Sequence, residues 1–156
     1  GVFRGGSARF LCEGKGDTKL RLFDTFAGLP EGSEEDGNVF RKSQYACSRP
    51  AVENYLKDFE NIQYHEGLFP DSTEGVDEVH EARYSLAHFD VDLYEGTVAC
   101  LEFFYPRMLA GGVMITHDYS ILAGVKQAFD EFFADKPEGL IEMPTTQCMI
   151  IKLADQ

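Results

Sequence analysis

The sequence predicts an α/β fold in which helices cover both faces of a doubly wound, mostly parallel sheet. Short apolar segments alternate along the chain with amphipathic helical patterns, and helical crossovers of this kind join parallel strands. The terminal segment Leu140–Leu153, LIEMPTTQCMIIKL, differs because its two apolar stretches are too close for a crossover helix. We therefore expect an antiparallel hairpin at one edge of the sheet.

The individual elements follow from the periodicity of apolar residues. The predicted strands are short and apolar: Leu20–Asp24, Asn61–Gly67, Tyr84–Asp90, Gly111–Asp118 and Met149–Leu153. The predicted helices carry an apolar face: Ser7–Gly14, Arg49–Phe59, Glu95–Leu109 and Gly124–Asp135. The segment Leu29–Asn38 is dense in glycine and acids and predicts a solvated loop.

Length and charge limit the possible classes of protein. The 156 residues predict one domain over residues 1–156, long enough to bury a core. The formal net charge of −13 argues against a nucleic-acid partner, which Lys and Arg would have to neutralise, and against an anionic membrane surface. Neither nucleic acid nor a membrane is therefore expected as a partner.

The four cysteines are scattered, at Cys12, Cys47, Cys100 and Cys148, and form no CxxC pair. This spacing predicts buried thiols in a reducing cytoplasm and no zinc cage. We expect no signal peptide, and the 156 residues contain no apolar segment long enough to span a membrane. The first residue is not Met, so we expect a preceding segment to be missing.

Polar side chains end the predicted strands, and this pattern indicates function. Ligands of open α/β sheets bind outside the carboxyl ends of the strands. A single functional edge is therefore predicted, although loops at strand ends are also polar without any function. The residues concerned are Asp24, Glu66, Asp90, Asp92, His117 and Asp118.

A glycine turn precedes the first predicted helix. Gly5, Gly6 and Ser7 let the backbone approach a ligand, and free N–H groups at a helix start favour anionic oxygen. Asp24 ends the next strand, where an acid commonly accepts hydrogen bonds from ribose hydroxyls. The two features together predict an adenosine-containing cofactor, and this pattern also suits NAD.

Several stretches resemble the motif series of the macrocin O-methyltransferase family, in order along nearly the whole chain. They are GVFRGGSA, LFDTFAGLPEG, YHEGLFPDS, HFDVDLYEGT, YPRMLAGGVMITHDYS and GVKQAFDEFF. The resemblance implies a Rossmann-like fold of the class I methyltransferase type and the cofactor S-adenosylmethionine. Several members of this family methylate sugar hydroxyls in antibiotic biosynthesis.

The resemblance also implies roles for particular residues. It assigns the cofactor to the turn of Gly5, Gly6 and Ser7, to Asp24 and to the edge at Asp90. It implies a divalent cation, Mg²⁺ or Mn²⁺, at Asp90, His117 and Asp118, and it makes Asp92 the general base. These are the expected cofactor, metal and catalytic residues.

Two departures from the family pattern stand out. His117 occupies a position where the family usually has an acid, and imidazole favours Mn²⁺, Fe²⁺, Ni²⁺ or Zn²⁺ over Mg²⁺. His117 could alternatively act as a catalytic base, or be a histidine that is merely hydrogen-bonded at the edge of the sheet. The family's first strand is absent from residues 1–156, so we expect an N-terminally truncated domain that forms a homo-oligomer, most simply a dimer.

These observations predict a metal-assisted methyltransferase that acts on a hydroxyl of a sugar or small polyol. One alternative is a non-catalytic, truncated relative that serves as an interaction subunit. The other is an NAD-dependent oxidoreductase, which the acidic edge fits poorly because hydride transfer needs no metal cluster.

Overall fold

The structure is a computed structural model that describes residues 1–37 and 39–154, and it divides into two compact units. Unit 1 contains Gly1–Glu31 and Phe40–Glu74. Unit 2 contains the described residues of Gly32–Val39 and Gly75–Gln156. The single methyltransferase-like domain over residues 1–156 stays a prediction.

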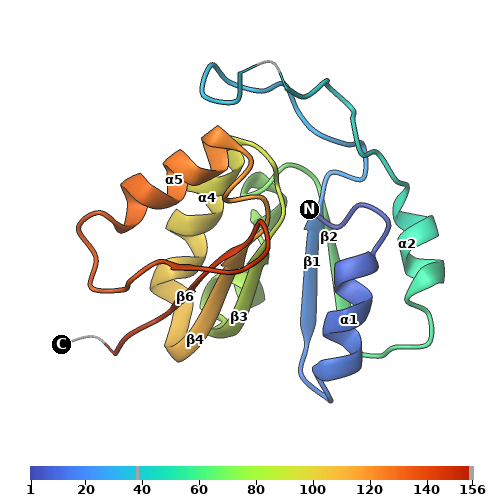
Figure 1. Ribbon diagram of the computed structural model, residues 1–156. Helices are drawn as coiled ribbons and strands as arrows, with labels where there is room; N and C mark the ends of the chain where they lie inside the picture. The colour runs from blue at the N-terminus through green and yellow to red at the C-terminus, as the bar shows by residue number, and fades with distance from the viewer. Residues whose placement is uncertain (38, 155–156) are drawn as a thin grey trace. The chain divides into compact units, whose positions relative to one another are not determined.

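Unit 1 is built on two parallel strands whose carboxyl ends coincide. Strands β1 and β2 pair in register from Leu20 with Ile62 to Asp24 with Glu66, so these two acids end neighbouring strands. Helix α1 lies alongside β1 (Figure 1). In chain order the elements are α1 Gly6–Gly14, β1 Leu20–Asp24, α2 Arg49–Tyr55, β2 Ile62–Glu66 and the 3-10 helix η1 Asp71–Thr73.

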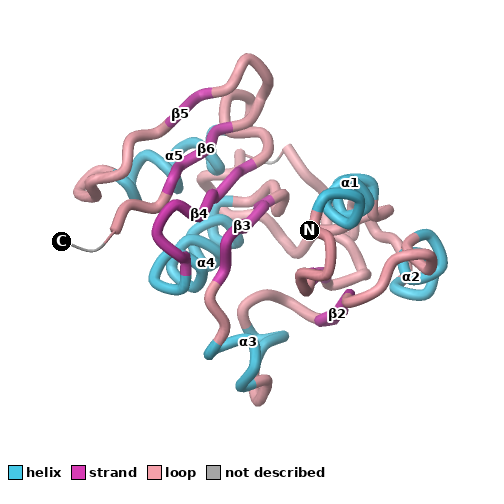
Figure 2. The backbone as a smooth tube through the Cα atoms, turned by 90° about the horizontal axis from the view of Figure 1, so that it is seen from below, coloured by secondary structure: helices cyan, strands magenta, loops and turns pink. Residues whose placement is uncertain are grey.

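Unit 2 is a four-stranded mixed sheet in the order β3-β4-β6-β5. Strands β3 and β4 are parallel, and β6 pairs antiparallel with both β4 and β5. Figure 2 shows α4 and α5 on one face of this sheet. In chain order the elements are α3 Asp77–Glu81, β3 Tyr84–Phe89, α4 Tyr94–Phe104, η2 Tyr105–Arg107, β4 Met108–Thr116, α5 Ala123–Phe133, β5 Ile141–Glu142 and β6 Cys148–Ile151.

The core of each unit forms where alternate strand residues meet an apolar helix face. In unit 2, the ring of Phe89 on β3 packs at a tilt against Phe104 of α4 and Phe129 of α5, at centroid distances of 5.7 and 6.4 Å. Met114 and Ile150 are a cross-strand pair on the same face, and both are fully buried. Unit 1 has a smaller core: Ala8, Leu22, Phe26, Val52 and Leu56.

The predicted elements agree with the structure except at some of their ends. The predicted helix Glu95–Leu109 begins one residue earlier, at Tyr94, and is followed by η2, which contains Pro106, so β4 begins at Met108 rather than at Gly111. Helix α2 is shorter than predicted and ends at Tyr55. The antiparallel edge pair is confirmed as β5 and β6, and the described strands form two sheets instead of one.

Two further predictions concern solvent exposure. Cys12, Cys100 and Cys148 are buried as expected, whereas Cys47 is only partly buried, and all four thiols are free. Most of the predicted loop Leu29–Asn38 is exposed, with Asn38 outside the described residues. Within the described ranges, every helix is too short or too polar to cross a membrane.

Candidate functional site

Parallel pairing of β3 and β4 brings three polar side chains of unit 2 to one edge of the sheet. Asp90 directly follows β3, and His117 and Asp118 directly follow β4. The last residues of the two strands, Phe89 and Thr116, are paired in register. The backbone N–H of His117 extends this pairing by donating to the carbonyl of Phe89 at 2.8 Å.

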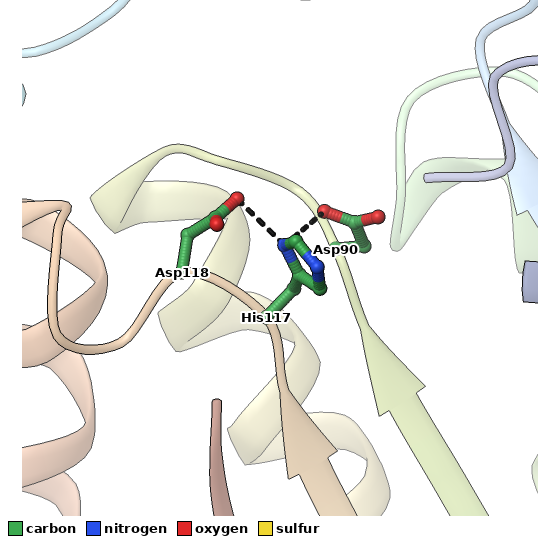
Figure 3. A group of neighbouring side chains, drawn as sticks. All are labelled: Asp90, His117 and Asp118. Atoms are coloured by element: carbon green, nitrogen blue, oxygen red, sulfur yellow. Dashed lines mark ion pairs between the residues drawn. The ribbon is translucent and has the colours of Figure 1, made fainter. Parts of the chain in front are cut away.

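The imidazole of His117 lies between the two carboxylates (Figure 3). Its Nδ1 atom is 2.8 Å from Oδ2 of Asp118 and 3.6 Å from Oδ1 of Asp90. Nδ1 is shielded from solvent, yet neither contact has the geometry of a hydrogen bond from the ring. This nitrogen therefore faces two acceptor oxygens without a satisfied bond within the described chain.

The carboxylates determine the electrostatics of this edge. Burial by itself lowers the pKa of His117, but the contact with Asp118 and the charge of Asp90 outweigh it, so the pKa is raised. Burial raises the pKa of the nearby Asp92 carboxyl to about 6, and the charges of Asp90 and Asp118 add to the shift. The edge is thus strongly negative and suited to a positive ligand.

The local backbone at this edge is strained. Asp92 and Asp118 have φ values of 61° and 55°, in the left-handed region that most side chains avoid and Asp tolerates. Thr146, in the segment between β5 and β6, contacts Oδ1 of Asp118 through its hydroxyl at 3.4 Å. Strain of this kind is commonly found at functional sites, where the surrounding structure maintains it.

The donor set of Asp90, His117 and Asp118 fits a divalent cation. One ligand atom from each residue lies within 4.8 Å of the other two. Ligand atoms on one transition-metal ion lie about 2.0–2.2 Å from it, so the three side chains need only small rotations to share an ion. A solvent-shielded Nδ1 without a hydrogen bond is also what a metal-ligating imidazole presents before binding.

In unit 1, Asp24 and the glycine turn are connected by hydrogen bonds. Oδ2 of Asp24 accepts from the backbone N–H groups of Val2 and Phe3 at 2.5 and 3.1 Å, and Oδ1 accepts from Phe26 at 2.7 Å. Asp24 therefore holds the segment that leads into Gly5. Its carboxylate is only partly buried, so lone pairs remain for a ligand.

The glycine turn forms the N-terminal end of α1, with Gly5 as its N-cap residue. Gly5 has a φ of 84° and precedes α1, and a Cβ there would lie 3.2 Å from Tyr55 and 3.3 Å from Val52. The N-cap residue Gly5 has no side chain that could cap α1. Gly6 and Ser7 form the exposed first turn of α1, whose N–H groups suit an anionic group.

A pocket of about 420 Å³ lies beyond the carboxyl ends of β1 and β2. Arg49 borders it and forms ion pairs with Glu53 at 2.7 Å and with Glu66 at 3.8 Å. Phe26 adds an apolar wall two residues after Asp24. The lining residues are Phe26, Ser48, Arg49, Pro50, Glu53 and Glu66.

The structure thus brings the predicted site residues together in two groups. One group, in unit 2, is formed by Asp90, Asp92, His117 and Asp118, and the other, in unit 1, by Gly5, Gly6, Ser7 and Asp24. Their meeting at a single edge stays a prediction. Sequence reasoning missed Thr146 and also Asp36, which the pattern does not distinguish from its acidic neighbours.

Comparison with known sequences identifies the family of the chain. The sequence profile of the macrocin O-methyltransferase (TylF) family matches residues 1–147. The chain is 31% identical over 137 residues to a rhamnosyl-tetracenomycin-C 4'-O-methyltransferase of Streptomyces olivaceus, covering 78% of this chain and 51% of the relative. It is 28% identical over 152 residues to the demethyldecarbamoylnovobiocin O-methyltransferase of Streptomyces niveus, covering 86% and 56%. The chain therefore spans about half the length of these curated relatives.

Solved structures show the same fold. The chain resembles the O-methyltransferase NovP with a TM-score of 0.79 and 23% identity, covering 99% of this chain and 70% of NovP. It resembles the calicheamicin methyltransferase CalS11 with a TM-score of 0.81 and 21% identity, covering 97% of this chain and 69% of CalS11. The predicted α/β methyltransferase fold is confirmed by these similarities, with mixed rather than mostly parallel strand pairing.

Proposed function

Because the chain belongs to the macrocin O-methyltransferase family of S-adenosylmethionine-dependent enzymes, we propose that it methylates a hydroxyl of a sugar or small polyol. The cluster of Asp90, His117 and Asp118 at the ends of two paired strands is the observation that carries this proposal. The Streptomyces olivaceus relative is named for 4'-O-methylation of a rhamnosyl group, which supports a sugar as the acceptor. We also propose that the strands and helices of this chain form the doubly wound arrangement predicted from the sequence.

Unit 1 would bind the nucleoside cofactor. Asp24 would accept hydrogen bonds from the ribose hydroxyls, as strand-end acids do in related sheets. Its bonds to Val2 and Phe3 hold the turn before Gly5, so that the open start of α1 can meet the anionic end of the cofactor. The pocket beside Phe26 and Arg49 supports a site for a flat, partly apolar group.

Unit 2 would bind the cation and orient the acceptor. Asp90, His117 and Asp118 would hold the ion and leave its other positions open for sugar oxygens. When bound, S-adenosylmethionine supplies the methyl group and the cation lowers the pKa of the acceptor hydroxyl. The side chains of this edge position that hydroxyl, because displacement at a methyl group needs an aimed oxygen and little covalent help.

Asp92 would remove the proton from the acceptor hydroxyl. It lies two residues after Asp90 and its carboxylate interacts with Asp90, Asp118 and His117. A half-buried carboxylate next to the bound acceptor can take a proton at one of its oxygens and keep it out of bulk water. His117 is the other candidate base, a role that metal binding at Nδ1 would exclude.

Calorimetric titration of the 156-residue chain with S-adenosylhomocysteine, with and without Mn²⁺ or Mg²⁺, tests the proposal. We expect S-adenosylhomocysteine to bind in either case. In a separate assay with S-adenosylmethionine as the methyl donor, we expect methyl transfer to a rhamnoside only with metal. Nucleoside binding without any transfer across a panel of sugars would favour the non-catalytic interaction subunit. Binding of NAD in place of S-adenosylhomocysteine would contradict the proposal.

We also propose that the chain forms a homodimer in the cytoplasm. Size-exclusion chromatography with light scattering tests the oligomeric state. A monomer at micromolar concentration would contradict the dimer and leave the proposed chemistry unaffected.

A further inference from the structure

Asp36 joins two parts of unit 2 that are far apart in the sequence. Its Oδ2 atom accepts hydrogen bonds from the backbone N–H and the hydroxyl of Ser33 at 2.9 and 3.0 Å, which closes a tight turn. Its Oδ1 atom accepts a hydrogen bond from the backbone N–H of Tyr94 at 2.7 Å, across 58 positions. One carboxylate therefore both shapes its own turn and binds a distant helix.

Tyr94 is the first residue of α4, which follows the segment of Asp90 and Asp92. The first N–H groups of a helix have no partner within the helix, and an acid there is favoured by hydrogen bonding and by the helix dipole. The N-cap residue of α4 is Leu93, which has no side chain able to serve. Asp36 supplies the missing cap from another part of the chain.

The same oxygen also lies against the start of α5. A Cβ on Gly124, the second residue of α5, would be 2.5 Å from Oδ1 of Asp36 and 3.2 Å from Cβ of Tyr94. Only a residue without a side chain permits this approach. Helix α5 follows the segment of His117 and Asp118, as α4 follows Asp90. Asp36 therefore lies at the start of both helices that follow the cluster residues.

We propose that Asp36 is a positioning residue. It sets the spacing between Asp90, which follows β3, and the pair of His117 and Asp118, which follows β4. Tyr94 follows Asp90 by four positions and Gly124 follows Asp118 by six, so a shift at either helix start moves a ligand residue. Asp36 acts through the backbone of Tyr94 and the packing against Gly124. This inference rests on the proposed metal site for its functional meaning.

The test uses two different changes that disrupt the same contact. Asp36→Ala removes the acceptor, and Gly124→Ala places a methyl group 2.5 Å from Oδ1, so that the carboxylate must move. Asp36→Asn keeps an oxygen acceptor and should therefore preserve the hydrogen bond from the backbone N–H of Tyr94. The matched controls are Glu34→Ala, an exposed acid of the same turn, and Gly139→Ala, where a Cβ meets nothing within 4 Å.

The first readout is Mn²⁺ affinity, measured by electron paramagnetic resonance at a temperature where circular dichroism shows each variant folded. We expect Asp36→Ala and Gly124→Ala each to weaken Mn²⁺ binding about tenfold or more, and Asp36→Asn and both controls to stay within about threefold. Folded variants with unchanged Mn²⁺ affinity would overturn the inference.

The second readout is amide hydrogen exchange, which needs no metal. We expect faster exchange in residues 90–94 and also in residues 117–124 for both disruptive variants. Faster exchange confined to residues 33–37 and 93–94 would reduce Asp36 to a local helix cap and overturn the inference. If the unaltered chain binds no Mn²⁺, the proposed metal site fails, while exchange in the two segments still decides the positioning role.

Discussion

The ammonium group of Lys152 lies 3.2 Å from Oε1 of Glu138, and both side chains are almost completely buried, at 9% and 0% exposed. The hydroxyl of Tyr105 donates to Oε2 of Glu138 at 2.8 Å, and the backbone N–H of Leu153 donates to Oε1 at 3.1 Å. The carboxylate is therefore surrounded by donors. This network joins the segment after α5 to the end of the chain beyond β6 and to η2.

We expect Glu138→Gln to destabilise unit 2 by about 3 kcal/mol at neutral pH, because it removes the negative charge that lies 3.2 Å from the buried ammonium group of Lys152. Burial alone would raise the pKa of Glu138, but the bonds from Tyr105, Leu153 and Lys152 outweigh it and lower the pKa below the ordinary 4.5. The stabilisation is thus present above about pH 4.5 and is lost as the pH falls through the lower folded-state pKa.

Guanidinium unfolding between pH 3.5 and 7 measures this effect, with the exposed Glu142→Gln as the control. The difference between Glu138→Gln and the unaltered chain should shrink below about pH 4.5. A difference that stays constant across this range would contradict the assignment.

We expect Asp24→Ala to weaken S-adenosylhomocysteine binding about tenfold or more. A hydrogen bond to a charged group contributes about 1.5–3 kcal/mol, and the change also frees Val2 and Phe3 from the carboxylate. Calorimetry measures the affinity, and Asp17→Ala, at an exposed acid of unit 1, is the matched control. Equal affinities for the two variants would remove Asp24 from the proposed cofactor site.

We expect His117→Glu to shift metal preference towards Mg²⁺ by about an order of magnitude relative to Mn²⁺. A carboxylate is a hard oxygen ligand that Mg²⁺ prefers, whereas imidazole favours transition metals. Competition of Mg²⁺ against bound Mn²⁺ measures the ratio, and His80→Gln, at an exposed residue of α3, is the control. An unchanged ratio would show that Nδ1 of His117 does not bind the ion.

We expect Asp92→Asn to lower the rate of methyl transfer about 10²–10⁴-fold while cofactor and metal affinity stay nearly unchanged. Asn tolerates the left-handed backbone that Asp92 adopts at a φ of 61°, so the variant should fold. Single-turnover kinetics under saturating metal measures the chemical step, with Asp77→Asn on α3 as the control. A rate within threefold of the unaltered chain would exclude Asp92 as the base.

The sequence by itself determined the order of strands and helices and the acids at the strand ends. Apolar periodicity and turn residues are local signals, so β1 is found within its predicted bounds. The proximity of Asp90 to His117 was also predictable, because parallel strands end at the same edge. The resemblance to a methyltransferase family was equally a property of the sequence.

Only the tertiary structure decided which groups became partners across long distances. Glu34, Glu35 and Asp36 are equivalent in pattern, and Asp36 differs from its neighbours because its side chain caps a helix 58 residues away. From the sequence alone, Glu138 is indistinguishable from a surface acid. In the structure, the packing of β6 and η2 brings Lys152 and Tyr105 into contact with it. Such contacts depend on how complete elements pack, and local propensity carries no information about that packing.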